Sequence, residues 1–280
     1  MEFIDKKHHA SAHALVLGFL QKNKNLHNGQ YTDDLYNNLC ADWCAPRVKT
    51  KKALTAILMQ EQNNRCCYCM RDIAVLPPEE RSIEHVIVNN PINGNDYNQY
   101  LGHGSTLDQA DIINASDFLQ TQTPPPPYPH SVAYENMLMS CAGRVHAGIR
   151  TSFTCNGKRA HTFLPPMPLM PTIHSEIKYR RDGFVYWTKD SRTESPFVEV
   201  VGLNEMVLQI IRRLWYKLAS RNEDSTTCDR QSIIYEVLGD MLDEGKDDAA
   251  LQLLFVFAKN SWYWHLLSQF NYFNDVNKFI

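Results

Sequence analysis

The 280-residue sequence lacks three features that would assign it to a broad class at once. It has no excess of basic residues: the formal net charge is −3, which argues against a protein that coats nucleic acid by charge alone. It has no apolar run of transmembrane length, and near its N-terminus no apolar segment ends in a small-residue cleavage site. We therefore expect a soluble, cytoplasmic protein. An enzyme that binds nucleic acid through one local basic strip, or together with a basic partner, remains compatible with this charge.

The sequence does contain eight cysteines. Disulfides are not expected in the cytosol, so clustered cysteines there favour a metal site. Cys66 and Cys69 form a C-x-x-C pair, a spacing that lets one tight turn present two thiolates to one ion. Thirteen residues separate Cys141 from Cys155, so a loop must fold back to bring the two cysteines together. The sequence thus predicts a structural Zn²⁺ site formed by Cys66, Cys69, Cys141 and Cys155.

Other side chains compete with this assignment. Cys67 is a rival for one position, and His146 is an alternative to a cysteine of the second half. Cys40 and Cys44 lie four residues apart in a segment that reads as helix plus turn, and packing is their expected role. Cys228 is expected to be a core thiol. The alternative for the first pair is two buried, apolar cysteines without a metal, and the two later cysteines make it the weaker interpretation.

Composition and periodicity divide the chain into three regions. Apolar residues at three- and four-residue spacing predict helices over 10–24 and 49–64, so residues 1–64 are expected to form an N-terminal helical region. Residues 65–175 hold most of the prolines and many asparagines and glycines, a composition typical of loops that carry ligands. Within them, about 93–130 is expected to be an insertion, with Pro124 to Pro127 as a stiff extended spacer.

Residues 176–280 are expected to form a β-hairpin followed by a C-terminal helical region. The hairpin is predicted over residues 177–186, where apolar residues alternate around Asp182-Gly183. Residues 197–201 are expected to add a short strand, and Asn204 to cap a long helix. Further helices are predicted at about 230–243 and 247–258, with a last helix after the Trp262 segment. The aromatic C-terminus is expected to be mostly core, with docking to a partner as the alternative.

A Glu-His pair lies between the two halves of the cysteine set. Glu84 and His85 read as the end of a strand, where both side chains can reach one site. A neutral imidazole can take a proton from water near neutral pH, and a carboxylate is a hard oxygen ligand for Mg²⁺. Taken alone, such a pair is more typical of a solvated strand end.

The set as a whole resembles the HNH endonuclease family. The resemblance rests on the C-x-x-C pair, the Glu-His pair, an asparagine before the third cysteine, and a final Cys-Asn followed by basic residues. In that family a ββα-metal finger is braced by a zinc knuckle. The resemblance implies an α+β fold in which such a finger is embedded between mostly helical N- and C-terminal regions.

Residue roles follow from the resemblance. His85 would be the general base, and Asn136 would orient it and hold the loop. Glu84 and Asn156 would bind a catalytic Mg²⁺ or Mn²⁺, with His161 as a rival for the last ligand. The basic residues nearest this site are expected to contact phosphate; they are Arg144, Lys158 and Arg159.

The resemblance extends to a narrower group. Cys66-Cys67-Tyr68-Cys69 after a helix, the later hairpin, and Val201 to Glu205 opening a helix that contains Arg212 and Arg213 are similar to the HNH subunits of bacterial antiphage systems. The most similar group is the Septu nuclease-subunit family (PtuB), with its retron-associated relatives. This implies an effector endonuclease that acts with an ABC-type ATPase (PtuA-like) and, in those relatives, with a retron reverse transcriptase–nucleic acid assembly. The alternative is a non-catalytic zinc-binding interaction module of such a complex.

Overall fold

The computed structural model describes most of the chain. The described residues are 1–26, 35–41, 50–86, 130–147, 150–160, 162, 164, 167–189, 196–259 and 261–280. Three predicted features lie outside them: almost all of the expected insertion at 93–130 with its proline run, Cys44, and His161. The described part has mixed helices and small sheets, in agreement with the α+β prediction.

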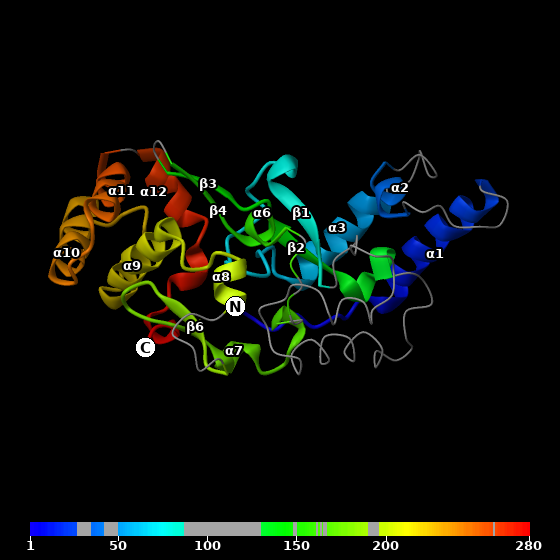
Figure 1. The fold of residues 1–280 in the computed structure, drawn as a ribbon, viewed down its shortest axis with the longest axis horizontal. Helices are drawn as coiled ribbons and strands as arrows, with labels where there is room; N and C mark the ends of the chain where they lie inside the picture. The colour runs from blue at the N-terminus through cyan, green and yellow to red at the C-terminus, as the bar shows by residue number, and fades with distance from the viewer. Residues whose placement is uncertain are drawn as a thin grey trace.

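Three helices form one end of the molecule (Figure 1). They are α1 (His9–Leu26), α2 (Leu35–Ala41) and α3 (Thr50–Glu61). On α1 the buried apolar residues recur at three- and four-residue spacing, from Ala12 through Val16 to Leu20. This face packs against α3, whose Leu54 and Leu58 are completely buried. Both predicted N-terminal helices are therefore confirmed.

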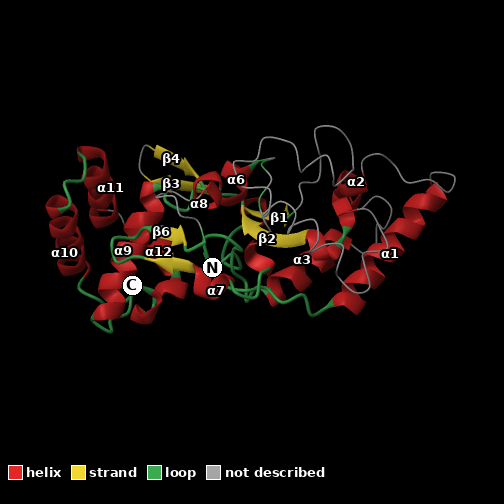
Figure 2. Cartoon of the chain, turned by 60° about the horizontal axis from the view of Figure 1, so that its bottom comes forward, coloured by secondary structure: helices red, strands yellow, loops and turns green. Residues whose placement is uncertain are grey.

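The centre of the molecule holds two short antiparallel pairs of strands and a short helix (Figure 2). β1 (Arg81–His85) pairs with β2 (Met137–Cys141), with Arg81 opposite Cys141 and His85 opposite Met137. β3 (Arg144–Ala147) pairs with β4 (Arg150–Phe153), and α6 (Cys155–Arg159) follows and packs on β2. The predicted strand at Glu84 and His85 is confirmed, whereas the β3–β4 hairpin was not predicted.

Short 3₁₀ turns flank this centre. They are η1 (Pro78–Glu80) before β1, and η2 (His130–Val132) and η3 (Tyr134–Asn136) before β2. Residues 1–8 run alongside, with the N–H of Ile4 donating to the carbonyl of Pro168 at 2.7 Å and Lys6 Nζ donating to the carbonyl of Met137 at 2.5 Å. The segment before α1 is thereby fixed next to the start of β2.

The C-terminal part consists of a hairpin and a group of helices. Its elements are η4 (Met167–Leu169), α7 (Ile173–Glu176), β5 (Ile177–Tyr179), β6 (Val185–Trp187), α8 (Pro196–Val200), α9 (Met206–Ser220), α10 (Arg230–Asp243), α11 (Asp248–Lys259), α12 (Ser261–Ser268), η5 (Asn271–Phe273) and η6 (Val276–Lys278). The predicted hairpin and the helices near 230–243 and 247–258 are confirmed. Gly183 closes the hairpin at φ +81°, and a Cβ there would lie 2.2 Å from the carbonyl oxygen of Gln209.

Two local predictions in this part were wrong. The segment expected to be a strand is the helix α8, because Phe197, Val198 and Val201 bury a helical face rather than alternate. Asn204 does not cap α9. Its amide accepts from the N–H of Val185 and donates to the carbonyl of the same residue, both at 2.9 Å, so it extends the edge of β6. The N-cap of α9 is Glu205.

The aromatic residues near the C-terminus are core residues where their side chains are described. Trp264, Phe270 and Phe273 are buried, and Trp264 Nε1 donates to the carbonyl of Ser225 at 2.5 Å. The guanidinium of Arg212 lies 5.9 Å from the centre of the Phe273 ring and donates to the carbonyls of Gly183 and Leu203 at 2.7 and 2.6 Å. Packing thus accounts for this aromatic cluster. No helix among the residues described is long and apolar enough to cross a membrane.

Candidate metal centre

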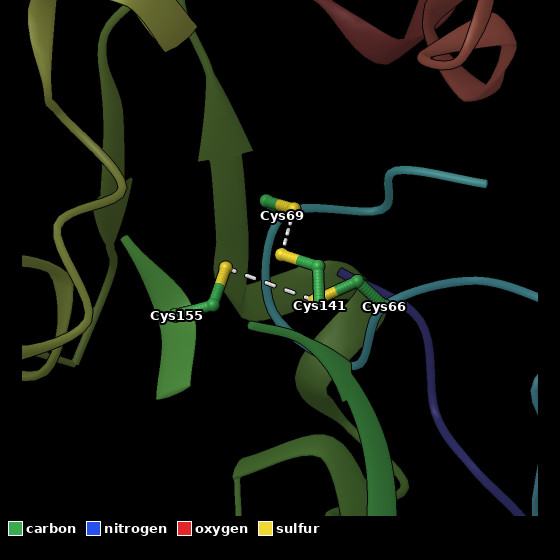
Figure 3. A group of neighbouring side chains, drawn as sticks. All are labelled: Cys66, Cys69, Cys141 and Cys155. Atoms are coloured by element: carbon green, nitrogen blue, oxygen red, sulfur yellow. Dashed lines mark hydrogen bonds between the residues drawn. The ribbon is translucent and has the colours of Figure 1, made fainter. Parts of the chain in front are cut away.

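The four predicted zinc cysteines come together in the centre of the molecule (Figure 3). Their Sγ atoms all lie within 4.8 Å of one another, with 3.7 Å between Cys66 and Cys155 and 3.8 Å between Cys69 and Cys141. A tetrahedral Zn²⁺ with Zn–S bonds of about 2.3 Å separates its sulfur ligands by about 3.8 Å. A disulfide would need about 2.05 Å. The spacing therefore fits one tetrahedral thiolate site.

A tight turn presents the first two sulfurs. Arg65 and Asp72 form an isolated antiparallel bridge at its base, and the N–H of Cys66 donates to the carbonyl of Arg71 at 2.8 Å. Met70 reverses the chain with φ +65°. The N–H of Cys67 donates to the carbonyl of Met139 at 3.0 Å, which fixes the turn against β2. Cys67 itself is buried beside the cluster but is not one of its four grouped sulfurs.

The β3–β4 hairpin closes the thirteen-residue gap between Cys141 and Cys155. Arg144 pairs with Phe153, so the chain leaves β2 and returns to the same point before α6 begins. Gly143 makes the return possible: its φ is +77°, and a Cβ there would lie 1.7 Å from the carbonyl oxygen of Thr154. The N–H of Thr154 donates to the carbonyl of Gly143 at 2.8 Å. The residues between Cys141 and Cys155 therefore form a hairpin that returns the chain to the cluster.

The electrostatics of the cluster suit a bound cation. All four thiols are buried. Burial opposes ionisation of Cys66, but hydrogen bonding with Cys141 and Cys155 outweighs it and holds the pKa of Cys66 well below its ordinary value. Burial, with hydrogen bonds to the neighbouring thiols, raises the pKa of Cys155 well above its ordinary value. Four thiolates this close together and out of water repel one another, so ionising all four needs a bound cation. A soft set of four sulfurs in tetrahedral spacing fits Zn²⁺.

Glu84 lies in a buried ion pair. Its Oε1 accepts from Arg159 Nη1 and, at 3.1 Å, from the hydroxyl of Tyr68. The residue is only 3% exposed. Burial raises the pKa of Glu84, and the guanidinium of Arg159 opposes that rise. The carboxylate is therefore neutralised from within the protein.

Arg159 is enclosed rather than displayed. Its relative exposure is 1%, and besides Glu84 and Tyr68 it donates to the carbonyls of His85 at 2.6 Å and Val86 at 2.7 Å. Burial opposes its charge, but Tyr68 and Glu84 together raise its pKa above the ordinary value. In this arrangement its role is to lock α6 to the end of β1. It does not face solvent as a phosphate contact would.

His85 points to a different set of partners from Glu84. Its Nε2 lies 2.9 Å from the carbonyl oxygen of Ser131, and its ring meets that of Tyr36 edge-on at 4.5 Å. A carbonyl can only accept, so Nε2 carries a proton and, in the neutral ring, Nδ1 carries the lone pair. The residue is 7% exposed. The structure thus orients His85 but covers it with α2.

The two asparagines hold the same region together. The carbonyl of Asn136 accepts from the N–H of Val86 at 3.0 Å, which ties the turn η3 to the end of β1. Asn156 Nδ2 donates to Ser82 Oγ at 2.6 Å. Ser82 and Glu84 are two residues apart and share one face of β1, so α6 lies across that face. Glu84 and Asn156 are therefore on one side of the strand, and His85 is on the other.

The remaining basic residues of the prediction lie at the surface. Lys158 is exposed and pairs with Glu205 at 2.5 Å, and Arg144 is exposed at the start of β3. Both can be reached from solvent next to α6. Glu84, the expected Mg²⁺ ligand, is not accessible in this way. Because Arg159 neutralises it, Glu84 does not offer an open carboxylate to Mg²⁺ in this conformation.

Several contributors to this region were not identified from the sequence. Tyr68 bridges Glu84 and Arg159, and Ser131 orients His85 through its carbonyl, which no residue-type pattern reveals. A second group of metal-ligand side chains, His9, His13 and Glu135, forms where α1 meets η3. Its signal was present as two histidines four residues apart. Comparison with protein-family models, curated proteins and solved structures returns no match.

Proposed function

We propose that the protein is a metal-dependent endonuclease of the HNH type, braced by one Zn²⁺, that hydrolyses phosphodiester bonds of nucleic acid. The observation that carries the proposal is the unit formed by β1, β2 and α6. Cys141 ends β2 and Cys155 begins α6, opposite the start of β1, while His85 lies at the far end of β1. With a rise of about 3.3 Å per residue, four residues separate brace and base by about 13 Å along the strand.

The proposed chemistry assigns each side chain a task. His85 takes the proton from an attacking water, with Ser131 holding the ring by Nε2. Lys158 and Arg144 supply solvent-accessible cations for the phosphate backbone. Mg²⁺ or Mn²⁺ is the proposed catalytic cofactor because of the family resemblance. Its binding by Glu84 and Asn156 requires Arg159 to leave the carboxylate, and its action together with His85 requires the end of β1 to rearrange so that both reach one phosphate.

The covered position of His85 supports a partner-controlled enzyme. Tyr36 of α2 packs on the imidazole, so a nucleic acid reaches His85 only after α2 moves. We accordingly propose that an ABC-type ATPase gates or delivers the substrate, as in the antiphage complexes that the sequence resembles. The chain would then be the effector subunit of a cytoplasmic, bacterial defence complex.

Cleavage assays test the proposal. The full chain is incubated with plasmid DNA and with tRNA, with and without the ATPase, in Mg²⁺ or Mn²⁺. His85→Ala is expected to abolish cleavage while zinc content and partner binding stay unchanged. His265→Ala, which removes an exposed histidine from α12, serves as the matched control. Cleavage by His85→Ala at the wild-type rate would refute the assignment.

A second function is favoured by the enclosure of Glu84 and His85. A non-catalytic zinc-binding interaction module needs the four cysteines and has no need of an accessible base. It predicts bound zinc and partner binding, without metal-dependent cleavage of any nucleic acid in either the wild type or His85→Ala.

A further inference from the structure

The junction between α1 and η3 gathers a second group of metal-ligand side chains. His9 and His13 are one helical turn apart in α1, so both project to one side of it. Glu135 comes from η3, more than a hundred residues later in the sequence. Among the residues that the structure describes, this group and the four cysteines are the only clusters with metal-binding spacing.

Both imidazoles point at the same carboxylate oxygen. His9 Nδ1 lies 3.1 Å and His13 Nε2 lies 2.6 Å from Glu135 Oε1. With metal–ligand bonds of about 2.0–2.2 Å, neighbouring ligand atoms of a tetrahedral ion lie about 3.3–3.6 Å apart. To admit an ion, the carboxylate oxygen must move away from His9 by about 0.2–0.5 Å and from His13 by about 0.7–1.0 Å. All three ligand atoms lie within 4.8 Å of one another.

The carboxylate is unusual in its surroundings. Glu135 is completely buried, yet its Oε2 has no hydrogen-bond partner in the described structure. A buried carboxylate with one oxygen unsatisfied is costly unless a cation compensates it. Lys6 does not fill that position: it donates to the carbonyl of Met137 and pairs with Glu61 at 3.5 Å.

The group is also open on one side. The side chain of His9 is 40% exposed and that of His13 is 16% exposed, whereas Glu135 is enclosed. A buried carboxylate with two histidines that water can reach leaves coordination positions for solvent. Two histidines and one carboxylate are the ligand set of open Zn²⁺ and Fe²⁺ sites.

We propose that His9, His13 and Glu135 form a second metal site, separate from the four cysteines, which binds a divalent transition-metal ion such as Zn²⁺ or Mn²⁺ with open positions for water. The ion would join α1 to η3. It would thereby fix η3 next to η2, which carries the Ser131 carbonyl that holds His85.

The test is a binding titration on the full chain with zinc retained at the four cysteines. Mn²⁺ is the first probe, because four thiolates disfavour Mn²⁺ relative to Zn²⁺ and so do not compete for it. Its binding is monitored by electron paramagnetic resonance. Co²⁺ is the second probe: at this site it should give visible bands without the thiolate charge-transfer absorption that the cysteines would produce. The wild type is expected to bind one ion in this way.

The matched variants are His9→Ala/His13→Ala and His8→Ala, which removes the adjacent imidazole outside the group. The double variant should lose binding by more than the roughly 10–100-fold that removal of an outer-shell partner costs. His8→Ala should bind as the wild type does. If the double variant loses its structural zinc, Glu135→Gln, which keeps the side-chain shape, should show the same loss of Mn²⁺. Equal Mn²⁺ and Co²⁺ binding by the wild type and the folded variants would overturn the proposal, as would no binding to the wild type.

Discussion

Replacing Arg159 by methionine separates the structural from the sequence-based interpretation of this residue. The sequence places Arg159 among the phosphate contacts, together with its neighbour Lys158. The structure encloses Arg159 in a network with Glu84, Tyr68 and the carbonyls at the end of β1. Methionine retains the unbranched apolar stem of the arginine side chain but removes its charge and all of its hydrogen-bond donors. The variant should therefore be strongly destabilised before any question of nucleic-acid binding arises.

The magnitude follows from the contacts that are lost. Removing one partner of a buried ion pair costs about 3–5 kcal/mol, because the other charge remains buried. The carbonyls of His85 and Val86 each lose a donor, at about 1–3 kcal/mol if they stay buried. Methionine recovers part of this through apolar burial. We expect a loss of at least about 4 kcal/mol in the free energy of unfolding, which in a chain of this size lowers the Tm by roughly 10 °C.

Lys158→Met is the matched control, because it removes the adjacent positive charge from the same short helix. The Lys158 side chain is 36% exposed, and its pair with Glu205 lies at the surface, so the loss should stay below about 1 kcal/mol. Thermal unfolding of wild type and both variants, with zinc content measured in parallel, makes the comparison. Arg159→Met with the Tm of Lys158→Met and a selective loss of nucleic-acid binding would refute the structural role.

The pH dependence supplies a second readout. Burial already raises the pKa of Glu84, and without Arg159 that pKa should rise further. A carboxyl group whose pKa is higher in the folded than in the unfolded state favours the folded state when it is protonated. The deficit of Arg159→Met should therefore shrink as the pH falls from 7 toward 5. The double variant Glu84→Gln/Arg159→Met should be more stable at pH 7 than Arg159→Met, and a simple cavity would show neither effect.

Two further predictions concern the backbone and a buried lysine. Gly143→Ala should lower the free energy of unfolding by more than about 2 kcal/mol and weaken zinc retention, because Gly143 has a positive φ and a Cβ there would clash with Thr154. Gly239→Ala, in the open interior of α10, should instead raise the free energy of unfolding by about 0.5–1 kcal/mol. Equal Tm shifts for the two variants would contradict this prediction. Burial lowers the pKa of Lys6 to about 8 from 10.5, so the unfolded chain binds the extra proton between these values and stability should rise with pH there. In urea unfolding, the free energy of unfolding of the wild type relative to that of Lys6→Met should rise by on the order of 3 kcal/mol between pH 8 and 10.5. A difference between the two proteins that does not change with pH would contradict this prediction.

The sequence predicts the elements whose cause is local. Helices with regular apolar spacing, such as α1 and α3, follow from periodicity, and the hairpin at Gly183 follows from its turn residues. The cysteine grouping was also predictable, because a C-x-x-C pair with two later cysteines matches the ligand set of a structural Zn²⁺ site. The β3–β4 hairpin that connects Cys141 to Cys155 was not predictable. It depends on the positive φ of Gly143, which becomes apparent only when β4 brings the chain back to Thr154.

The polar network could not be predicted because burial decides the role of each charge. Arg159 and Lys158 are adjacent and chemically alike in the sequence, yet one is enclosed and the other exposed. Glu84 and His85 are likewise adjacent, but the strand sends them to opposite faces with different partners. The roles of such residues depend on which face of β1 the helix α6 covers, and this is set by contacts distant in sequence.

The most direct test of the zinc-braced unit is the zinc content of Cys155→Ala compared with Cys67→Ala. Both cysteines are buried and lie next to Cys66, but only Cys155 belongs to the group of four sulfurs. We predict that Cys67→Ala keeps one cysteine-bound zinc per chain and that Cys155→Ala loses it and unfolds at a lower temperature. Zinc retained by Cys155→Ala and lost by Cys67→Ala would contradict the site, and with it the closure of β2 and α6 around one metal ion.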